Sequence, residues 1–236
     1  MSEKVLRDVV SFVRRGDRMN PSQQRAWDEL SPRWVVKVPQ GPRSTSIAPD
    51  APPLDFTEVF GREAPVHVEV GIGDGATIAH VAEQHPEINF LGFEVFLPTT
   101  ASALGRCKRA GVENVRIVVA DAEQAFEQII PPSSVTEVWT FFPDPWHKKR
   151  HHKRRIINPR FAASVAKALI QGGRWRIATD WEDYAEWIAG VMDGIPELVD
   201  EFPEGAPRWN LRPITRFEQR ALNAGRKVAD MVYVKR

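Results

Sequence analysis

The sequence predicts an α/β protein built on a doubly wound, mostly parallel β-sheet. From residue 66 onward, short apolar runs alternate with segments of helical periodicity, which is typical of βαβ units. A glycine-rich turn follows the first apolar run, and acidic residues stand at the ends of the next ones. Because the carboxyl ends of parallel strands meet at one edge of such a sheet, we expect a ligand site at that edge.

Five apolar runs are expected to form strands, and four further segments are expected to form helices. The strands read VHVEVGIG, NFLGFEV, VRIVVAD, VTEVWTFF and RWRIATD in chain order. The helices read TIAHVAEQH, TTASALGRCKRAG, PRFAASVAKALI and WEDYAEWIAGVM. Asn158 is expected to cap the third helix, with Pro159 in its first turn, and Gly172 and Gly173 to end it. The segment VADMVYVKR near the C-terminus is expected to add an edge strand.

Residues 1–60 differ from the rest of the chain because they are rich in Arg and Pro. The stretch 38–56 contains too many prolines for a continuous helix or a central strand. We therefore divide the chain into a partly flexible N-terminal extension, residues 1–60, and one large domain, residues 61–236.

Composition narrows the class of protein. The chain has 236 residues, of which 42% are hydrophobic and 27% charged, as in a globular protein with a core. Its net charge is only +1, so attraction for a polyanion has to come from local clusters. Cys107 is the single cysteine, which excludes an internal disulfide, and its place in a helix argues against a cysteine nucleophile. Without an apolar run of about 18 residues, we expect a cytoplasmic protein with no membrane segment.

Gly71, Gly73 and Gly75 follow the first strand and precede the first helix of the sheet domain. Glycines in this position permit a tight turn and a close approach of the backbone to a nucleotide cofactor. The alternative is a turn that needs glycine only for its own geometry. Ala76 completes a G-x-G-x-x-A pattern, which leaves a dinucleotide open as well.

Three acids lie at or near the ends of neighbouring strands: Glu69, Glu94 and Asp121. We expect them to line a single pocket, which would repel a pyrophosphate and favour a ligand with a cationic centre and several donors. S-adenosylmethionine has both, with a ribose diol that suits Glu94 and an adenine amine near Asp121. Each acid alone could instead cap a helix or lie in a solvated turn.

The segment FFPDPWHKKRHHKRR, residues 141–155, follows the fourth strand. Asp144 stands between Pro143 and Pro145, which restrict the backbone and would hold its carboxylate in place, although a simple Asx turn has the same pattern. Residues 147–155 carry six Lys or Arg, three His and no acid, a density that favours phosphate contacts over a solvated face. So much positive charge argues against a divalent metal.

These motifs resemble those of the bacterial tRNA (guanine-N7-)-methyltransferase family. The resemblance is carried by FFPDPWHKKRHHKRR and, in the family's order, by SFVRRGDRMNPSQQRAW, EVGIGDG, NFLGFEV, IATDWEDYAEW and RPITRFEQR. It implies a seven-stranded sheet of the class I, Rossmann-like methyltransferase type. It also implies methyl transfer from S-adenosylmethionine to N7 of guanine 46 in the variable loop of tRNA. The segments EVFLPTTAS and ALNAGRKVADMVY depart from the family pattern.

The resemblance also implies roles for individual residues. Asp144 would be catalytic, and the cofactor would contact Glu69, Gly71, Gly73, Glu94, Asp121 and Asp144. The substrate would contact Lys148, Asp180, Thr215, Arg216, Phe217 and Glu218. The RNA would contact Arg150, His151, His152, Lys153, Arg154 and Arg155. Asp180 could instead cap the following helix; the choice between monomer and homodimer stays open.

Other functions fit parts of the sequence. A methyltransferase for another RNA base or for a small molecule would use the same cofactor site, and a non-catalytic RNA-binding protein could keep the fold. The acids and glycines of the cofactor site are all in place, which favours an active enzyme, and the basic run favours an RNA substrate over a small molecule. A dinucleotide oxidoreductase fits least, because the acids oppose a pyrophosphate.

Overall fold

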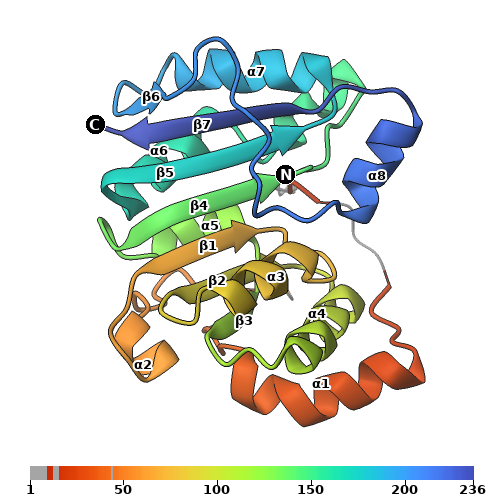
Figure 1. Ribbon diagram of the computed structural model, residues 1–236. Coiled ribbons are helices and arrows are strands. Elements are labelled where there is room, and N and C mark those ends of the chain that lie inside the picture. The colour runs from red at the N-terminus through yellow and green to blue at the C-terminus, as the bar shows by residue number, and fades with distance from the viewer. Residues whose placement is uncertain (1–9, 13–15, 44) are drawn as a thin grey trace, which may run out of the picture.

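The computed structural model describes residues 10–12, 16–43 and 45–236, and its centre is a seven-stranded sheet (Figure 1). The strand order is β3-β2-β1-β4-β5-β7-β6; β1 to β5 pair in parallel, and β7 is antiparallel to both of its neighbours. The strands are β1 Val66–Val70, β2 Asn89–Glu94, β3 Val115–Val119, β4 Val135–Phe141, β5 Leu169–Thr179, β6 Leu198–Asp200 and β7 Ala229–Lys235. The predicted doubly wound, mostly parallel architecture is confirmed.

Helices cover both faces of this sheet (Figure 1). One face carries α1 Pro21–Trp34, α3 Ala76–Gln84 and α4 Leu97–Ala110. The other carries α5 Ala122–Gln128, α6 Pro159–Ala168 and α7 Glu182–Met192. Two shorter helices, α2 Phe56–Phe60 and α8 Arg216–Asn223, complete the set, together with the 3-10 helix η1 Lys149–Arg154.

The sheet separates two hydrophobic cores, and the side chains of its strands point alternately into one and the other. In β1, Val66 and Val68 pack into the core that contains α5, α6 and α7. Phe90 of β2 and Trp139 of β4 pack into the core that contains α3 and α4. The central parallel strands β1, β2 and β4 are therefore buried on both faces, as expected for a parallel sheet covered by helices.

The C-terminal part of the sheet differs from the prediction. The strand β7 is not at the edge; it lies between β5 and β6, and the short β6 is the edge strand. The helix α6 begins as predicted, with the Asn158 side chain accepting from Phe161 N, but it ends at Ala168. Leu169 already pairs with Val135 of β4, so Gly172 and Gly173 lie in an irregular part of β5 and do not end the helix.

The N-terminal extension is packed on the domain where the structure describes it. Asn20 and Gln23 form a capping box that starts α1, and Leu30 and Trp34 of this helix are buried against α4. Residues 1–9, 13–15 and 44 of the extension that we expected to be partly flexible lie outside the described residues. No helix in the described part of the chain is long and apolar enough to cross a membrane.

Candidate active site

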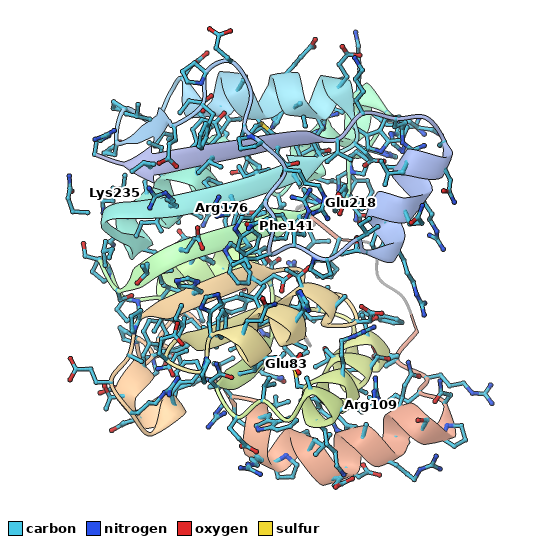
Figure 2. The ribbon with its side chains drawn as sticks, viewed as in Figure 1. Glu83, Arg109, Phe141, Arg176, Glu218 and Lys235 are labelled. Atoms are coloured by element: carbon cyan, nitrogen blue, oxygen red, sulfur yellow. The ribbon has the colours of Figure 1, made fainter. Side chains whose placement is uncertain are left out.

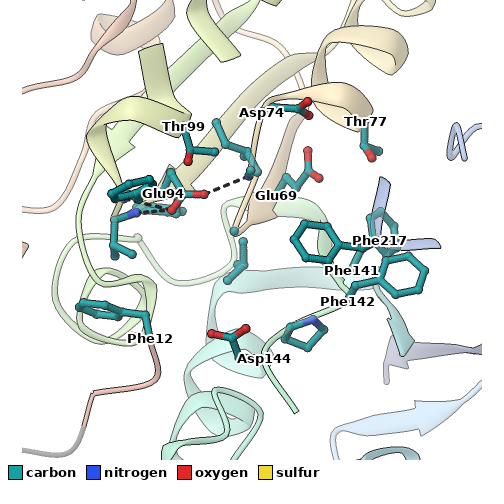
Figure 3. A pocket seen from close by; sticks show the side chains of 18 of the residues that line it. Phe12, Glu69, Asp74, Thr77, Glu94, Thr99, Phe141, Phe142, Asp144 and Phe217 are labelled. Carbon is teal, nitrogen blue, oxygen red and sulfur yellow. Dashed lines mark hydrogen bonds between the residues drawn. The ribbon is translucent and has the colours of Figure 1, made fainter. Parts of the chain in front are cut away.

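A cavity of about 550 Å³ opens at the carboxyl ends of β1, β2 and β4 (Figure 3). The loop after β1, the loop after β4, the start of α8 and the N-terminal segment all contribute to its wall. Its acidic lining residues are Glu69, Asp74, Glu94 and Asp144. Two arginines, Arg216 and Arg220, also line it. The cavity therefore lies at the predicted edge of the sheet, and its excess of acids favours a ligand that carries positive charge.

The glycines of the β1–α3 loop divide into two roles. Gly71 and Gly73 have φ of 75° and 55°, which L side chains rarely adopt, and a Cβ at either position would meet no atom within 4 Å. A Cβ on Gly75 would lie 2.8 Å from the Cβ of Ala103. Gly75 thus permits close packing against α4, whereas Gly71 and Gly73 leave open space for a ligand.

Glu94 connects the end of β2 to the glycine loop. Its carboxylate accepts hydrogen bonds from the backbone N–H groups of Gly73 at 3.0 Å, Val95 at 2.8 Å and Phe96 at 3.1 Å. These three backbone donors hold the carboxylate at the cavity wall, and Glu94 in turn holds the glycine loop in place.

Glu69 of β1 is 4% exposed, and among the described residues its Oε2 atom has no hydrogen-bond donor. Burial raises the pKa of Glu69 well above its usual value, and the charges of Asp74 and Glu94 raise it further, against a hydrogen bond from the Ile78 backbone that lowers it. A buried carboxylate oxygen without a donor is costly. A bound ligand that offers a cation or a donor would relieve that cost.

Asp121 does not join the other acids. Its side chain accepts from Glu123 N at 3.0 Å and caps α5, as the helix-capping alternative proposed. It lines a second cavity of about 490 Å³ together with Arg43 and Lys153. The expectation of three acids in one pocket is thus correct for Glu69 and Glu94 but not for Asp121, whose neighbours Ala120 and Ala122 line the main cavity instead.

Asp144 lies in the loop after β4, is exposed, and lines the cavity (Figure 3). The loop has an unusual backbone, because Phe142 and Trp146 adopt φ of 51° and 50°. Non-glycine residues in this region store strain and persist only where surrounding contacts hold them. The prolines predicted a restricted turn; the two left-handed residues around it could not be predicted.

The basic run divides into exposed and internal residues. The side chains of Lys148, Lys149, Arg150 and Lys153 are exposed, and Lys153 lines the second cavity with Asp121. Arg155 is 1% exposed and pairs with Asp183 of α7. Only part of the run is therefore positioned to contact a polyanion.

Arg154 and Trp146 bind the N-terminal segment. The guanidinium of Arg154 lies 3.8 Å from the Trp146 ring and donates to the carbonyl oxygens of Val10 and Phe12, and Trp146 Nε1 donates to Ser11 O. Ser11 and Phe12 consequently form part of the cavity wall. Sequence reasoning missed these two wall residues, although they belong to the segment SFVRRGDRMN that contributed to the family resemblance.

The two histidines expected to contact RNA are half-buried. His151 meets the edge of the Trp146 ring, and partial burial, together with the nearby cations, lowers its pKa. His152 lies 3.8 Å from the carboxylate of Asp183 and against Trp187. Both histidines therefore pack against protein groups beside the exposed lysines.

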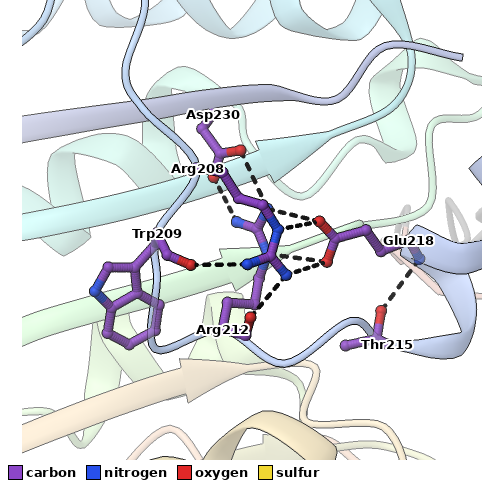
Figure 4. A network of polar contacts seen from close by, with 6 residues as sticks. All are labelled: Arg208, Trp209, Arg212, Thr215, Glu218 and Asp230. Carbon is purple, nitrogen blue, oxygen red and sulfur yellow. Dashed lines mark hydrogen bonds and ion pairs between the residues drawn. The ribbon is translucent and has the colours of Figure 1, made fainter. Parts of the chain in front are cut away.

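The start of α8 completes the cavity. Thr215, Arg216 and Phe217 line it, and the Thr215 hydroxyl accepts from Glu218 N to cap the helix. Glu218 itself is 2% exposed and turns away from the cavity into a buried network with Arg208, Arg212 and Asp230 (Figure 4). The expected role of Glu218 as a substrate contact does not match this placement.

Asp180 also lies outside the cavity lining. Its carboxylate accepts from Arg226 Nε at 2.7 Å, and the Arg226 guanidinium lies over the ring of Trp181. The alternative role as a helix cap is also not observed, because Trp181 is the N-cap of α7 and has no side-chain cap bond. Asp180 therefore joins β5 to the segment that follows α8.

Comparison with known proteins identifies the class of protein. Residues 63–231 match a family model described as a putative methyltransferase. A tRNA (guanine-N(7)-)-methyltransferase of Cutibacterium acnes is 49% identical over 234 residues, covering 98% of this chain and 84% of that protein. One of Paraburkholderia xenovorans is 44% identical over 230 residues, with coverage of 98% and 84%.

Solved structures support the fold independently. A 16S rRNA (adenine(1408)-N(1))-methyltransferase mutant of Catenulisporales acidiphilia matches with a TM-score of 0.55 at 17% identity, over 84% of this chain and 98% of that one. The 16S rRNA methyltransferase KamB matches with a TM-score of 0.54 at 19% identity, over 76% and 92%. These likenesses show the class I methyltransferase fold. The near full-length sequence matches show that this chain belongs to the tRNA (guanine-N(7)-)-methyltransferase family.

Proposed function

We propose that this protein transfers a methyl group from S-adenosylmethionine to N7 of guanine 46 in the variable loop of tRNA. The observation that carries the proposal is the acidic cavity at the strand ends, which contains the buried oxygen of Glu69 and whose lining residue Asp144 is followed in the chain by the exposed cations Lys148, Lys149 and Arg150. A cationic cofactor suits the cavity, and a polyanionic substrate suits its rim.

The cavity fits the proposed cofactor. Gly71 and Gly73 leave room for close backbone approach, and Glu69 and Glu94 offer acceptors to its ammonium and hydroxyl groups. Asp144 adds a third carboxylate across the cavity (Figure 3). When bound, S-adenosylmethionine supplies an electrophilic methyl group on a sulfonium centre.

The reaction needs no general base. N7 of guanine carries an in-plane lone pair and no proton at neutral pH, so it can take the methyl group in line. The bond from the methyl carbon to the sulfonium sulfur would break as the bond to N7 forms, which leaves a neutral thioether, S-adenosylhomocysteine, and a cationic product ring. Asp144 then serves by accepting hydrogen bonds from guanine N1–H and the exocyclic amine. Its negative charge also stabilises the positive charge that develops on the ring.

Aromatic side chains form the wall beside Asp144. Phe141 and Phe142 line the cavity from the end of β4, and Phe217 of α8 is 58% exposed at its rim (Figure 3). An exposed phenylalanine at the mouth of a polar cavity offers a face on which a nucleobase can stack. We assign Phe217 to the guanine side of the site.

The exposed cations are expected to contact phosphates. Replacing Arg150 or Lys153 with Ala should weaken tRNA binding and lower the slope of log K against log salt by about 0.7 to 0.9 for each phosphate that the variant no longer neutralises. Titrations of labelled tRNA at several salt concentrations measure that slope. Arg236→Ala, which removes an exposed cation next to Lys235 at the other end of the sheet (Figure 2), is the matched control and should keep the wild-type slope.

Glu69→Gln should weaken S-adenosylmethionine binding by about 10- to 100-fold, the equivalent of one charge-assisted hydrogen bond. The folded-state pKa of Glu69 is raised, so the free energy of unfolding of the ligand-free protein should fall as the pH rises through that pKa. The variant without the carboxylate should lose this part of the pH dependence. Calorimetric titration and thermal unfolding from mildly acidic to mildly alkaline pH measure both effects.

The control for this change is Glu83→Gln, which alters an exposed acid of α3 away from the cavity (Figure 2). It should keep the cofactor affinity and the pH profile of the wild type. Equal cofactor affinity of wild type and Glu69→Gln would contradict the assignment of Glu69.

The proposal as a whole is tested by incubating the protein with labelled S-adenosylmethionine and unmodified tRNA transcripts. Borohydride and aniline then cleave the RNA at 7-methylguanosine. Cleavage at the variable-loop guanine is the expected result. Methylation of another base, or none, would contradict the proposal.

A further inference from the structure

Arg155 is the last residue of the basic run, yet it cannot reach a phosphate in this structure. It is 1% exposed, and its guanidinium packs over the rings of Tyr184 at 4.7 Å and Trp187 at 5.4 Å. Both rings belong to α7, on the side of the sheet that α5 and α6 also cover. A buried cation of this kind needs fixed partners inside the protein.

Those partners join two separate elements. Nε of Arg155 donates to Pro145 O at 2.9 Å, and Nη1 and Nη2 donate to the carbonyl and the carboxylate of Asp183 at 3.3 and 2.6 Å. Asp183 lies in the first turn of α7, and Pro145 directly follows Asp144. One planar guanidinium therefore connects the loop after β4 to α7.

The loop depends on such external support. Pro143 and Pro145 have no N–H group, so the backbone around Asp144 has few donors of its own. Phe142 and Trp146, on either side, have positive φ, a conformation that needs surrounding contacts to persist. The hydrogen bond from Arg155 to Pro145 O therefore lies next to Asp144, the residue that we propose contacts the guanine.

The segment around Arg155 is itself firmly held. The Tyr184 hydroxyl accepts from Ile157 N at 3.3 Å, and Trp187 Nε1 donates to Ile157 O at 2.7 Å. Helix α7 thus fixes the backbone two residues beyond Arg155. Helix α7 also supports the loop after β4 through the side chain of Arg155.

We infer that Arg155 is a positioning residue that holds the Asp144 loop in its productive place, and not a contact to RNA. The inference rests on the proposed function, because it assigns a role relative to the catalytic Asp144. It predicts that changes at Arg155 act on turnover and leave tRNA affinity intact.

The decisive variant is Arg155→Lys, which keeps the charge but cannot bond Pro145 O and both Asp183 oxygens in one plane. We expect kcat to fall by about 10- to 100-fold, the cost of a misplaced catalytic group. The Kd values for tRNA and S-adenosylmethionine and the salt slope of tRNA binding should equal those of the wild type. Steady-state kinetics and binding titrations measure these quantities separately.

Two further variants separate positioning from loss of structure. Arg116→Lys is the matched control, because Arg116 also donates to backbone carbonyls and packs over a ring, that of Phe60, near the amino end of β3, away from the carboxyl strand ends that form the cavity. It should lower the Tm but keep kcat. Asp183→Asn keeps the backbone carbonyl and weakens the charged bond to Arg155, together with the 3.8 Å contact to His152. It should therefore lower kcat by a smaller factor than Arg155→Lys, and it tests the role of Arg155 even if Arg155→Lys does not fold.

The outcomes discriminate between the roles. A phosphate contact would tolerate lysine, so wild-type kcat in both Arg155→Lys and Asp183→Asn would overturn the inference. A raised Kd for tRNA with unchanged kcat would overturn it as well. A wild-type protein that does not methylate tRNA at guanine N7 would contradict the proposed function instead, a result that is known before any variant is made.

Discussion

The Asp144→Asn variant is expected to lower kcat for methyl transfer by about 100- to 1,000-fold, the range seen when one preorganised electrostatic group is removed from an active site. Its affinity for S-adenosylmethionine should stay near that of the wild type. The carboxylate acts mainly on the guanine and its developing charge, whereas Glu69 and Glu94 remain to bind the cofactor.

The size of the effect follows from the chemistry of guanine. An aspartate accepts from both N1–H and the exocyclic amine, whereas an asparagine places an N–H donor against one of these two donors. The amide also lacks the charge that stabilises the cationic product ring. The change therefore removes a stabilising interaction and adds an unfavourable one in the same place.

Single-turnover kinetics and calorimetric titration with S-adenosylmethionine measure the two quantities independently. Asp193→Asn, an exposed change at the C-cap of α7, is a control for the loss of one negative charge. Asp144→Asn with wild-type turnover would show that Asp144 has no role in the chemical step. A large loss of cofactor affinity would show instead that Asp144 acts in cofactor binding.

The sequence predicted those parts of the site that depend on where strands end. Glu69 and Glu94 lie at the ends of apolar runs, and the carboxyl ends of adjacent parallel strands converge whatever the packing around them. Asp121 has the same sequence context, but its side chain caps α5 and lines the neighbouring cavity. The direction of a side chain at a strand end depends on which backbone donors lie nearby, and that is a tertiary property.

The basic run shows a second limit. In sequence, Arg155 is indistinguishable from Arg150 or Lys153, because the residue that pairs with it, Asp183, comes 28 positions later. Glu218 likewise belongs to a conspicuous motif, yet its partners Arg208 and Arg212 precede it in a segment without periodicity. Charge density predicts that some residues of a run contact a polyanion, and packing decides which ones.

The order of the last strands shows a third limit. The apolar pattern of β7 predicted a strand, but the three-residue β6 is too short to give a pattern of its own. Without β6, β7 would be the edge strand beside β5. The pairing of β7 with both neighbours therefore could not be predicted from the sequence.

Glu218→Gln is expected to destabilise the folded protein by about 3 to 5 kcal/mol, the usual cost of breaking a buried ion pair. Glu218 accepts from Arg208 at 2.7 Å and from Arg212 at 3.2 Å, and the Arg212 side chain is completely buried (Figure 4). The variant would leave Arg212 with Asp230 as its remaining carboxylate. Because Arg212 also packs over Phe141 and Phe142, the cavity wall should loosen together with α8.

The effect should depend on pH in a defined direction. Burial raises the pKa of Glu218, but the hydrogen bonds from Arg208 and Arg212 outweigh it and leave that pKa below its usual value. A carboxyl with a lowered folded-state pKa stabilises the protein above its unfolded-state pKa and loses this contribution as the pH falls through the folded-state value. The difference in free energy of unfolding between wild type and Glu218→Gln should therefore be largest at neutral pH and shrink in acid.

Urea unfolding at neutral and acidic pH measures this difference. Glu113→Gln is the matched control, because it breaks the exposed pair with Arg33 and should cost no more than about 1 kcal/mol at either pH. A substrate contact and a buried structural acid then give opposite results. If Glu218 contacts the substrate, the free energy of unfolding of its variant changes as little as that of the control, and only tRNA binding or turnover is lost. If Glu218 holds α8 in place, the free energy of unfolding falls, and activity falls as a consequence.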